Sequence, residues 1–354
     1  MNAKLQKMNR LIETAQRLRS QRSHHLHRLP VIVLMPHSAC NCRCVMCDIW
    51  KANADKREIA PAELARHLEA FRRLGVRWVV LSGGEALMHG NLWMLCELLK
   101  SLRIKITLLS TGLLLQRHAE NVARWCDEVI VSLDGSREVH DRIRNIPQAY
   151  EKLVDGVKAL RLVSPRQRVT GRCVLQKMNF FDLPNLIRAA QEIGLTQISF
   201  LAADVFSTAF NRATPWESPR LAEIALAENE VEAFAALVEK TIVDFAAAFE
   251  SGFIAESPDK LRRLPQYYAA ILGKNEFPAQ RCNAPWVSAV IEADGAVRPC
   301  FFHEPLGNLR ANSLDAVLNS ERAVAWRRNL AVQTNPICRT CTCSLYLKPW
   351  AKID

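Results

Sequence analysis

The sequence lacks a membrane-spanning segment and a secretory signal. No apolar run in its 354 residues approaches the roughly 20 residues that a transmembrane helix needs. Near the N-terminus, the apolar pair Leu11-Ile12 is followed at once by charged residues, beginning with Glu13, which is not the pattern of a signal peptide. These two absences predict a cytoplasmic protein.

Internal repeats and low-complexity tracts are also missing, which excludes solenoid and disordered architectures. Hydrophobic residues make up 49% of the chain and charged residues 23%, an ordinary globular mixture. The length suffices for one large domain and a smaller one.

Acidic residues are scarce in residues 1–29, where Glu13 stands against seven lysines and arginines, a net charge of +6 in a chain of net charge +11. Apolar residues recur there at helical spacing (Leu5, Met8, Leu11, Ile12, Ala15 and Leu18). The segment predicts a basic amphipathic helix that binds an anionic membrane surface, binds an acidic partner, or packs on its own protein with its other face in solvent. We favour the third interpretation. No nucleic-acid motif or aromatic interleaving accompanies the charge, so we expect no nucleic-acid partner.

Strand-like and helix-like segments alternate over residues 30–204. Apolar, β-branched runs lie at 31–35, 76–81, 104–109, 128–133, 169–175 and 197–201, and amphipathic stretches lie at 61–74, 90–102, 116–125, 147–163 and 182–193. Repeated βα units predict a parallel sheet with right-handed crossovers. We expect an α/β fold with a partial (β/α)6 TIM-like barrel; a doubly wound open sheet is the alternative. Such barrels place chemistry at the C-terminal ends of their strands.

Two further segments follow. Residues 205–277 predict a helical connection, in which 222–249 is rich in Ala and Glu and 211–219 is a loop. Residues 278–354 predict a small C-terminal α+β domain, with a hairpin around an Asp294-Gly295 turn and a helix near 313–328.

Twelve cysteines in a cytoplasmic chain indicate metal binding rather than disulfides. They fall into an N-terminal group (Cys40, Cys42, Cys44 and Cys47), a C-terminal group (Cys282, Cys300, Cys338, Cys341 and Cys343) and three single residues (Cys96, Cys126 and Cys173). The three single residues are expected to be small buried hydrophobes.

Cys40, Cys44 and Cys47 form a C-x3-C-x2-C loop directly after the first predicted strand. Three thiolates on one short loop can hold three irons of a 4Fe-4S cluster and leave the fourth iron open to a small molecule. Zinc is the alternative, with Cys42 or His37 as the fourth ligand. A closed zinc site would not explain the Gly-rich and Ser-Leu-Asp-Gly segments at neighbouring strand ends, and we expect His37 to pack or hydrogen-bond beside the loop.

The loop resembles the signature of the radical S-adenosylmethionine (SAM) superfamily. The resemblance implies that the open iron binds the amino and carboxylate groups of SAM. It also implies that one electron, from a reductant such as flavodoxin or ferredoxin, cleaves SAM to methionine and a 5′-deoxyadenosyl radical.

Two more strand ends resemble this family. Gly83-Gly84-Glu85 is similar to its GGE motif, which contacts the SAM amino group; Ala86 follows where the family usually has Pro. Ser132-Leu133-Asp134-Gly135, followed by an H-D-x-x-R segment ending at Arg144, resembles the branch with extra clusters. The resemblance places Ser132 and Asp134 near the ribose and carboxylate of SAM. Arg144 would pair with a carboxylate there or form a structural salt bridge.

The C-terminal group resembles the SPASM and twitch auxiliary-cluster domains. Twelve residues separate Cys282 from Gly295, four more precede Cys300, and a C-x2-C pair follows at Cys338 and Cys341. These four thiolates would close a second 4Fe-4S cluster, with Cys343 as a spare or a replacement for Cys341; zinc is the rival metal. Three further cysteines of a full SPASM domain are not found before Asp354, so we expect the shorter version with one auxiliary cluster.

The resemblance implies abstraction of a hydrogen atom from an unactivated C–H bond. We expect an oxidoreductase acting on a small molecule such as a sugar-like alcohol. A maturase of a ribosomally made peptide is one alternative, which the short stretch before the barrel weakens. A non-catalytic iron–sulfur carrier or scaffold is another, although a carrier needs no SAM pocket. Beyond the clusters we assign no catalytic residue; Asp204 would face the cavity or cap a helix, and His303 and Glu304 lie beside Cys300.

Overall fold

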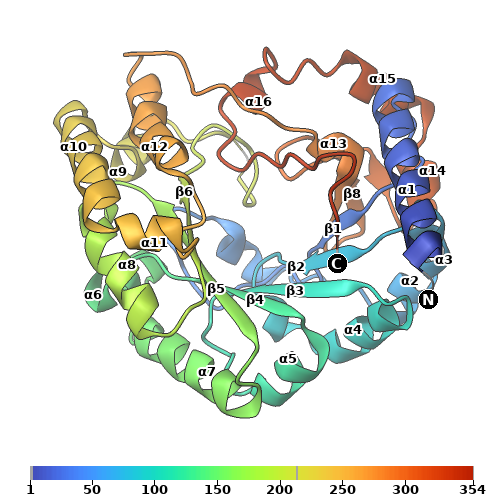
Figure 1. Cartoon of the computed structure of the whole chain (residues 1–354), viewed down its shortest axis with the longest axis horizontal. Helices are drawn as coiled ribbons and strands as arrows, with labels where there is room; N and C mark the ends of the chain where they lie inside the picture. Colours follow the sequence, from blue (N-terminus) through green and yellow to red (C-terminus); the bar gives the residue numbers. More distant parts are fainter. Residues whose placement is uncertain (1–2, 213, 354) are drawn as a thin grey trace.

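The computed structural model describes residues 3–212 and 214–353, and its centre is one curved sheet (Figure 1). Nine strands pair in the order β6-β5-β4-β3-β2-β1-β7-β8-β9. The first six are β1 (Val31–Leu34), β2 (Trp78–Leu81), β3 (Lys105–Ser110), β4 (Glu128–Ser132), β5 (Arg168–Leu175) and β6 (Ile198–Ala202). All six are parallel to their neighbours.

The strand order confirms the predicted partial barrel. A doubly wound sheet reverses its strand order at a switch point, whereas here β1 to β6 follow one another in chain order across the sheet. The alternative prediction of a doubly wound sheet is therefore wrong.

Helices cover the outer side of the curved sheet (Figure 1). The helices of the barrel are η1 (Ile49–Ala54), α2 (Pro61–Ala65), α3 (Leu68–Leu74), η2 (Ala86–Met88), α4 (Leu92–Ser101), α5 (Ala119–Trp125), α6 (Arg137–Arg144), α7 (Ala149–Val163), η3 (Phe180–Asp182) and α8 (Leu183–Glu192). Alternate strand residues, such as Ile32, Val79 and Val129, are fully buried in the core beneath these helices. Successive side chains of a strand point to opposite faces, so the intervening residues face the interior.

The stretch predicted to be a helical connection contains α9 (Ser218–Ile224), α10 (Glu228–Asp244), α11 (Ala246–Glu250) and α12 (Pro258–Ile271). Tyr268 of α12 is fully buried and fixes this connection to the sheet. Its hydroxyl donates to the carbonyl oxygen of Leu175 and accepts from the backbone N–H of Ala203, at 2.5 and 3.0 Å.

The C-terminal segment continues the barrel sheet. It contains α13 (Ala284–Val287), β7 (Ser288–Ile291), β8 (Ala296–Arg298), β9 (Gly307–Asn308), α14 (Leu314–Leu318), α15 (Glu321–Asn329) and α16 (Pro336–Arg339). The predicted hairpin is confirmed, since β7 and β8 are antiparallel around Asp294 and Gly295. However, β7 also pairs in parallel with β1, so the sheet runs without a break from the barrel into the predicted C-terminal domain.

The helix predicted in residues 1–29 is α1 (Ala3–Ser23), which lies along one edge of the molecule beside the C-terminal segment (Figure 1). Across residues 3–212 and 214–353, none of the helices combines the length and the apolar character required to cross a bilayer.

Candidate functional site

One cavity of about 550 Å³ brings both cysteine groups together. It is lined by Cys40, Cys44 and Cys47 of the first group and by Cys282, Cys300, Cys338, Cys341 and Cys343 of the second. The two groups are far apart in sequence and meet because β7 joins β1, the strand that precedes the first group.

The strands supply the rest of the cavity wall. Its apolar part is formed by the inward-facing side chains Val31, Val33, Trp78, Val80, Leu109, Ile130, Val174, Leu201 and Val290. Its polar part lies mainly at or beyond the C-terminal ends of the strands and includes Gly83, Gly84, Ser110, Thr111, Ser132, Arg144 and Asp204. The chemistry-bearing residues are therefore at the end of the barrel where the sequence predicted them.

The loop of the first cysteine group is held by hydrogen bonds to three other segments. The backbone N–H groups of Arg43 and Val45 donate to carbonyl oxygens at the end of α6, at 3.1 and 3.0 Å. The Asn53 side chain accepts from the N–H of Cys40 and donates to its carbonyl oxygen, both at 2.9 Å. The backbone N–H of Glu85 donates to the carbonyl oxygen of Ala39 at 2.9 Å. The loop conformation is thus fixed by the protein itself.

The donor set of this loop fits a cluster better than a zinc ion. Burial raises the pKa of the Cys40 and Cys47 thiols to about 12 each, so metal binding would have to release their protons. Cys42 is buried but does not line the cavity. As predicted, His37 hydrogen-bonds beside the loop: its Nδ1 accepts from the N–H of Ala39 at 2.9 Å, and its Nε2 lies 3.1 Å from Glu58.

The arrangement of the three loop thiols around the cavity also favours a cluster over a zinc ion. A zinc ion, with Zn–S bonds of about 2.3 Å, draws its ligands close around one point. A cubane cluster spreads its thiolates over different irons, and three thiols around a shared cavity suit that requirement.

The second cysteine group has hydrogen-bond donors to its sulfur atoms. The backbone N–H groups of Ala284 and Cys343 donate to the sulfurs of Cys282 and Cys341, both at 3.4 Å. Nε2 of the buried His303 lies 3.4 Å from the sulfur of Cys338. Donors to sulfur are a means by which a protein tunes an iron–sulfur cluster. These residues therefore fit a second cluster, and the role of Cys343 stays a prediction.

Arg144 connects the first cysteine loop to a buried carboxylate. Its guanidinium forms an ion pair with the fully buried Asp134 and donates to the sulfur of Cys44 at 3.5 Å. Burial lowers the pKa of Arg144, but Asp134 and Cys44 raise it more, so the residue stays a cation. Asp134 in turn accepts from the N–H of Val174 at 2.9 Å. The sequence analysis left two roles open for Arg144, pairing with a carboxylate of SAM or forming a structural salt bridge. The structure shows a salt bridge, with Asp134.

Two residues predicted to lie at the SAM site, Glu85 and Asp134, have side chains that do not line the cavity, and their contacts with SAM stay predictions. Glu85 is fully buried behind the cavity wall, where its carboxylate accepts from the N–H and the hydroxyl of Thr111, both at 2.7 Å, and from Ser110 at 3.1 Å. Asp134 is likewise fully buried and does not line the cavity. Gly83, Gly84, Ser132 and Arg144 do line it, and their contacts with SAM remain predictions.

The loop between β6 and α9, together with α9 itself, contacts the first cysteine loop, which the sequence analysis missed. Arg212 and Arg220 donate to the carbonyl oxygens of Met46 and Val45, and Trp216 donates to the carboxylate of Asp48 at 3.3 Å. Arg212 also pairs at 2.8 Å with Asp204, which lines the cavity. No motif marks these residues, so only their spatial position reveals the contact.

Replacing Gly84 with alanine should displace the first cysteine loop. A Cβ atom at Gly84 would lie 2.0 Å from the carbonyl oxygen of Ala39, a backbone atom that cannot turn aside. We expect the iron content of the anaerobically reconstituted protein to fall from about eight to about four atoms per chain. Gly90→Ala is the matched control, because a Cβ there meets nothing within 4 Å. Full iron content in Gly84→Ala would show that the close approach is not required.

Two family models match the chain; they cover the first cysteine group and all of the second except Cys343. Residues 34–190 match the radical SAM superfamily, and residues 282–342 match the SPASM iron–sulfur cluster-binding domain. A radical SAM domain binds SAM and a 4Fe-4S cluster, and a SPASM domain binds additional iron–sulfur clusters.

Curated relatives are similar over part of their length. Pre-heme d1 synthase of Dinoroseobacter shibae is 28% identical over 169 residues, 47% of this chain and 41% of that protein. A probable GTP 3′,8-cyclase of Thermococcus kodakarensis is 28% identical over 49% of this chain and 58% of its own. The subtilosin biosynthesis protein AlbA of Bacillus subtilis is 22% identical over 79% of this chain and 57% of its own. The chain spans about half the length of the curated relatives it matches.

Solved structures share the fold. SuiB of Streptococcus suis, bound to the precursor peptide SuiA, superposes with a TM-score of 0.64 at 15% identity, covering 98% of this chain and 78% of that one. The enzyme anSMEcpe with bound AdoMet has a TM-score of 0.60 at 15% identity and covers 88% of each chain. The chain belongs to the radical SAM superfamily and carries a SPASM iron–sulfur domain in its C-terminal segment.

Proposed function

We propose that the chain removes a hydrogen atom from an unactivated C–H bond and catalyses a net oxidation. Cys40, Cys44 and Cys47 would hold the first cluster, and Cys282, Cys300, Cys338 and Cys341 the second. When bound, the first cluster and SAM supply a 5′-deoxyadenosyl radical, and the second cluster supplies an electron acceptor. The observation that carries the proposal is the single cavity lined by both cysteine groups.

The chain's own residues would position SAM at the strand ends. Gly83 and Gly84 have no side chain, so their backbone can approach a ligand closely. Ser132 offers a hydroxyl to the cavity, and Arg144 offers a cation beside Cys44, which suits a carboxylate. Electrons would come from a reductant such as flavodoxin or ferredoxin.

The apolar wall of the cavity would keep water away from the reacting atoms. Valine, leucine and isoleucine side chains from β1 to β6 face the interior beside the cysteine loops. A site that excludes water suppresses side reactions of reactive species. The apolar character of this wall also affects which class of substrate can bind.

The apolar wall favours a peptide side chain over the sugar-like alcohol. A polyol buried against valine and leucine would leave several hydroxyls without hydrogen bonds, which is costly. An aliphatic or aromatic side chain would meet no such penalty. AlbA is named for the biosynthesis of a bacteriocin, and SuiB was solved with its precursor peptide, which agrees with this choice. We therefore propose maturation of a peptide.

The test is deuterium transfer into 5′-deoxyadenosine. The reconstituted protein would be incubated with SAM, dithionite and either a perdeuterated peptide of apolar residues or a perdeuterated polyol. We expect mass spectrometry to detect deuterated 5′-deoxyadenosine with the peptide. Deuterium transfer from the polyol alone would reverse the choice of substrate class, and absence of 5′-deoxyadenosine in both would contradict the reaction.

A further inference from the structure

Helix α1 packs on the protein through its polar face. Arg17 and Ser20 are buried, and Arg17 donates to the carbonyl oxygens of Pro349 and Ala351 at 3.2 and 2.8 Å. The hydroxyl of Ser20 accepts from the backbone N–H of His27 at 2.9 Å. The inward side of this helix is therefore held by ion pairs and hydrogen bonds.

The apolar face of α1 points to solvent. Met8, Leu11 and Ile12 are 52%, 64% and 50% exposed, and Ala15, one turn further on, is exposed as well. A surface helix of a globular protein normally buries its apolar stripe and exposes its polar one. This helix does the reverse: it is docked on its own protein, as in our favoured interpretation, and the face left in solvent is the apolar one.

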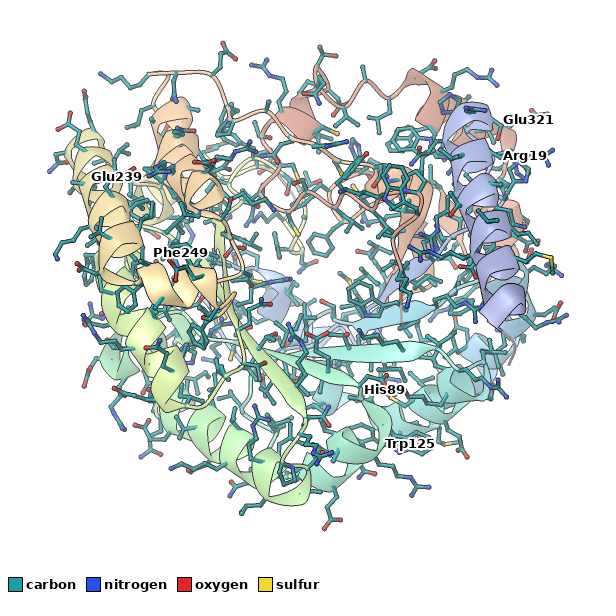
Figure 2. The ribbon with its side chains drawn as sticks, viewed as in Figure 1. Arg19, His89, Trp125, Glu239, Phe249 and Glu321 are labelled. Atoms are coloured by element: carbon teal, nitrogen blue, oxygen red, sulfur yellow. The ribbon has the colours of Figure 1, made fainter. Side chains whose placement is uncertain are left out.

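The exposed face carries positive charge and no negative charge. Glu13 is the one acidic residue in the sequence of α1, and it is turned inward, paired with Arg28 and, at 3.4 Å, with Arg77. Arg19 and Arg22 continue the face of Met8 and Ala15 by helical position and are exposed. Figure 2 labels Arg19 on α1 at the rim of the molecule. The outward surface is thus an apolar stripe that ends in two free cations.

The size of this stripe argues for a lipid surface as its occupant. A stable protein interface buries about 800 Å² on each partner, and three half-exposed side chains on one helix supply only a fraction of that area. Adsorption to a bilayer needs less, because a few apolar side chains enter the interface while basic residues bind anionic headgroups. Trp350, whose carbonyl oxygen accepts from Arg10 at 3.1 Å, is 57% exposed beside this helix, and tryptophan favours membrane interfaces.

We propose that α1 docks the enzyme on an anionic membrane surface, inserting Met8, Leu11 and Ile12 among the lipids while Arg19 and Arg22 contact the headgroups. This inference is independent of the proposed function, because none of the described side chains of α1 lines the cavity that holds both cysteine groups. Docking of α1 on a membrane would leave the cavity and the cysteines that line it unchanged.

Vesicle co-sedimentation of the full reconstituted protein tests the proposal. We expect the protein to sediment with phosphatidylcholine vesicles that contain phosphatidylglycerol, less so at high salt, and hardly at all with pure phosphatidylcholine. Leu11→Glu/Ile12→Glu should weaken binding about tenfold or more. Leu162→Glu, which alters an 85% exposed leucine on α7, is the matched control and should bind as wild type does.

Three results would overturn the proposal. They are no binding of the wild-type protein to the anionic vesicles, an equal loss in Leu162→Glu, or a wild-type dimer that becomes a monomer in Leu11→Glu/Ile12→Glu without vesicle binding. Unchanged iron content and 5′-deoxyadenosine formation would confirm that the variants fold. Arg19→Glu/Arg22→Glu provides a second variant, which leaves the apolar residues in place and should also lose binding.

Discussion

Replacing Cys40, Cys44 and Cys47 together with alanine is expected to abolish 5′-deoxyadenosine formation from SAM and dithionite. These three thiols line the cavity on a loop that the end of α6, Asn53 and Glu85 hold in place. Without them the N-terminal cluster has no ligands, and the iron content should fall from about eight to about four atoms per chain. Chromatography of the reaction mixture and iron analysis of the reconstituted protein measure the two effects.

Cys282→Ala/Cys300→Ala is the matched control for this variant. It should also lower the iron content to about four atoms per chain, yet it should retain 5′-deoxyadenosine formation, because it leaves the first loop intact. Persistent 5′-deoxyadenosine formation in the triple variant would remove the proposed mechanism. Loss of 5′-deoxyadenosine formation in both variants would mean that SAM cleavage depends on both cysteine groups.

Arg144→Met is expected to destabilise the protein by about 3–5 kcal/mol, because it leaves the buried carboxylate of Asp134 without its ion-pair partner. It also removes the donor to the sulfur of Cys44. Urea unfolding of the reconstituted protein measures the loss. Arg142→Met is the matched control, since Arg142 lies two residues earlier on α6 and is exposed; we expect its effect to be small.

A second variant separates the charge effect from simple loss of packing. Asp134→Asn in the Arg144→Met background replaces the unpaired carboxylate with a neutral amide, so part of the stability should return. Equal stability of Arg144→Met and wild type would show that the ion pair does not hold the site together. No recovery in the double variant would assign the loss to packing.

The barrel strands could be predicted from the sequence because each run contains β-branched residues and all but the last are followed by an amphipathic stretch. The predicted runs at 31–35 and 128–133 differ from β1 and β4 by a single residue. Helix α6 was missed because it is short and its apolar face consists of only two residues, Val139 and Ile143, which is too brief a pattern to stand out in the sequence. The continuation of the sheet through β7 was also missed, since pairing between β1 and β7 joins segments too distant for a local pattern.

The grouping of the cysteines that line the cavity could be predicted because their spacing is typical of cluster ligands. The side-chain directions of Glu85 and Asp134 could not, because a motif specifies residue types and not whether a carboxylate faces a cavity or a neighbouring backbone. Arg212 reaches the carbonyl oxygen of Met46 across 166 positions of sequence. In α1 the helical period was evident, but long-range contacts of Glu13 and Arg17 decide which face is buried.

The central claim is that the first cluster has only three protein ligands and an iron open to SAM. Electron paramagnetic resonance of the dithionite-reduced Cys282→Ala/Cys300→Ala variant tests it most directly, because only the first cluster contributes to that spectrum. We predict that adding SAM shifts the signal. A spectrum that SAM leaves unchanged would contradict the claim.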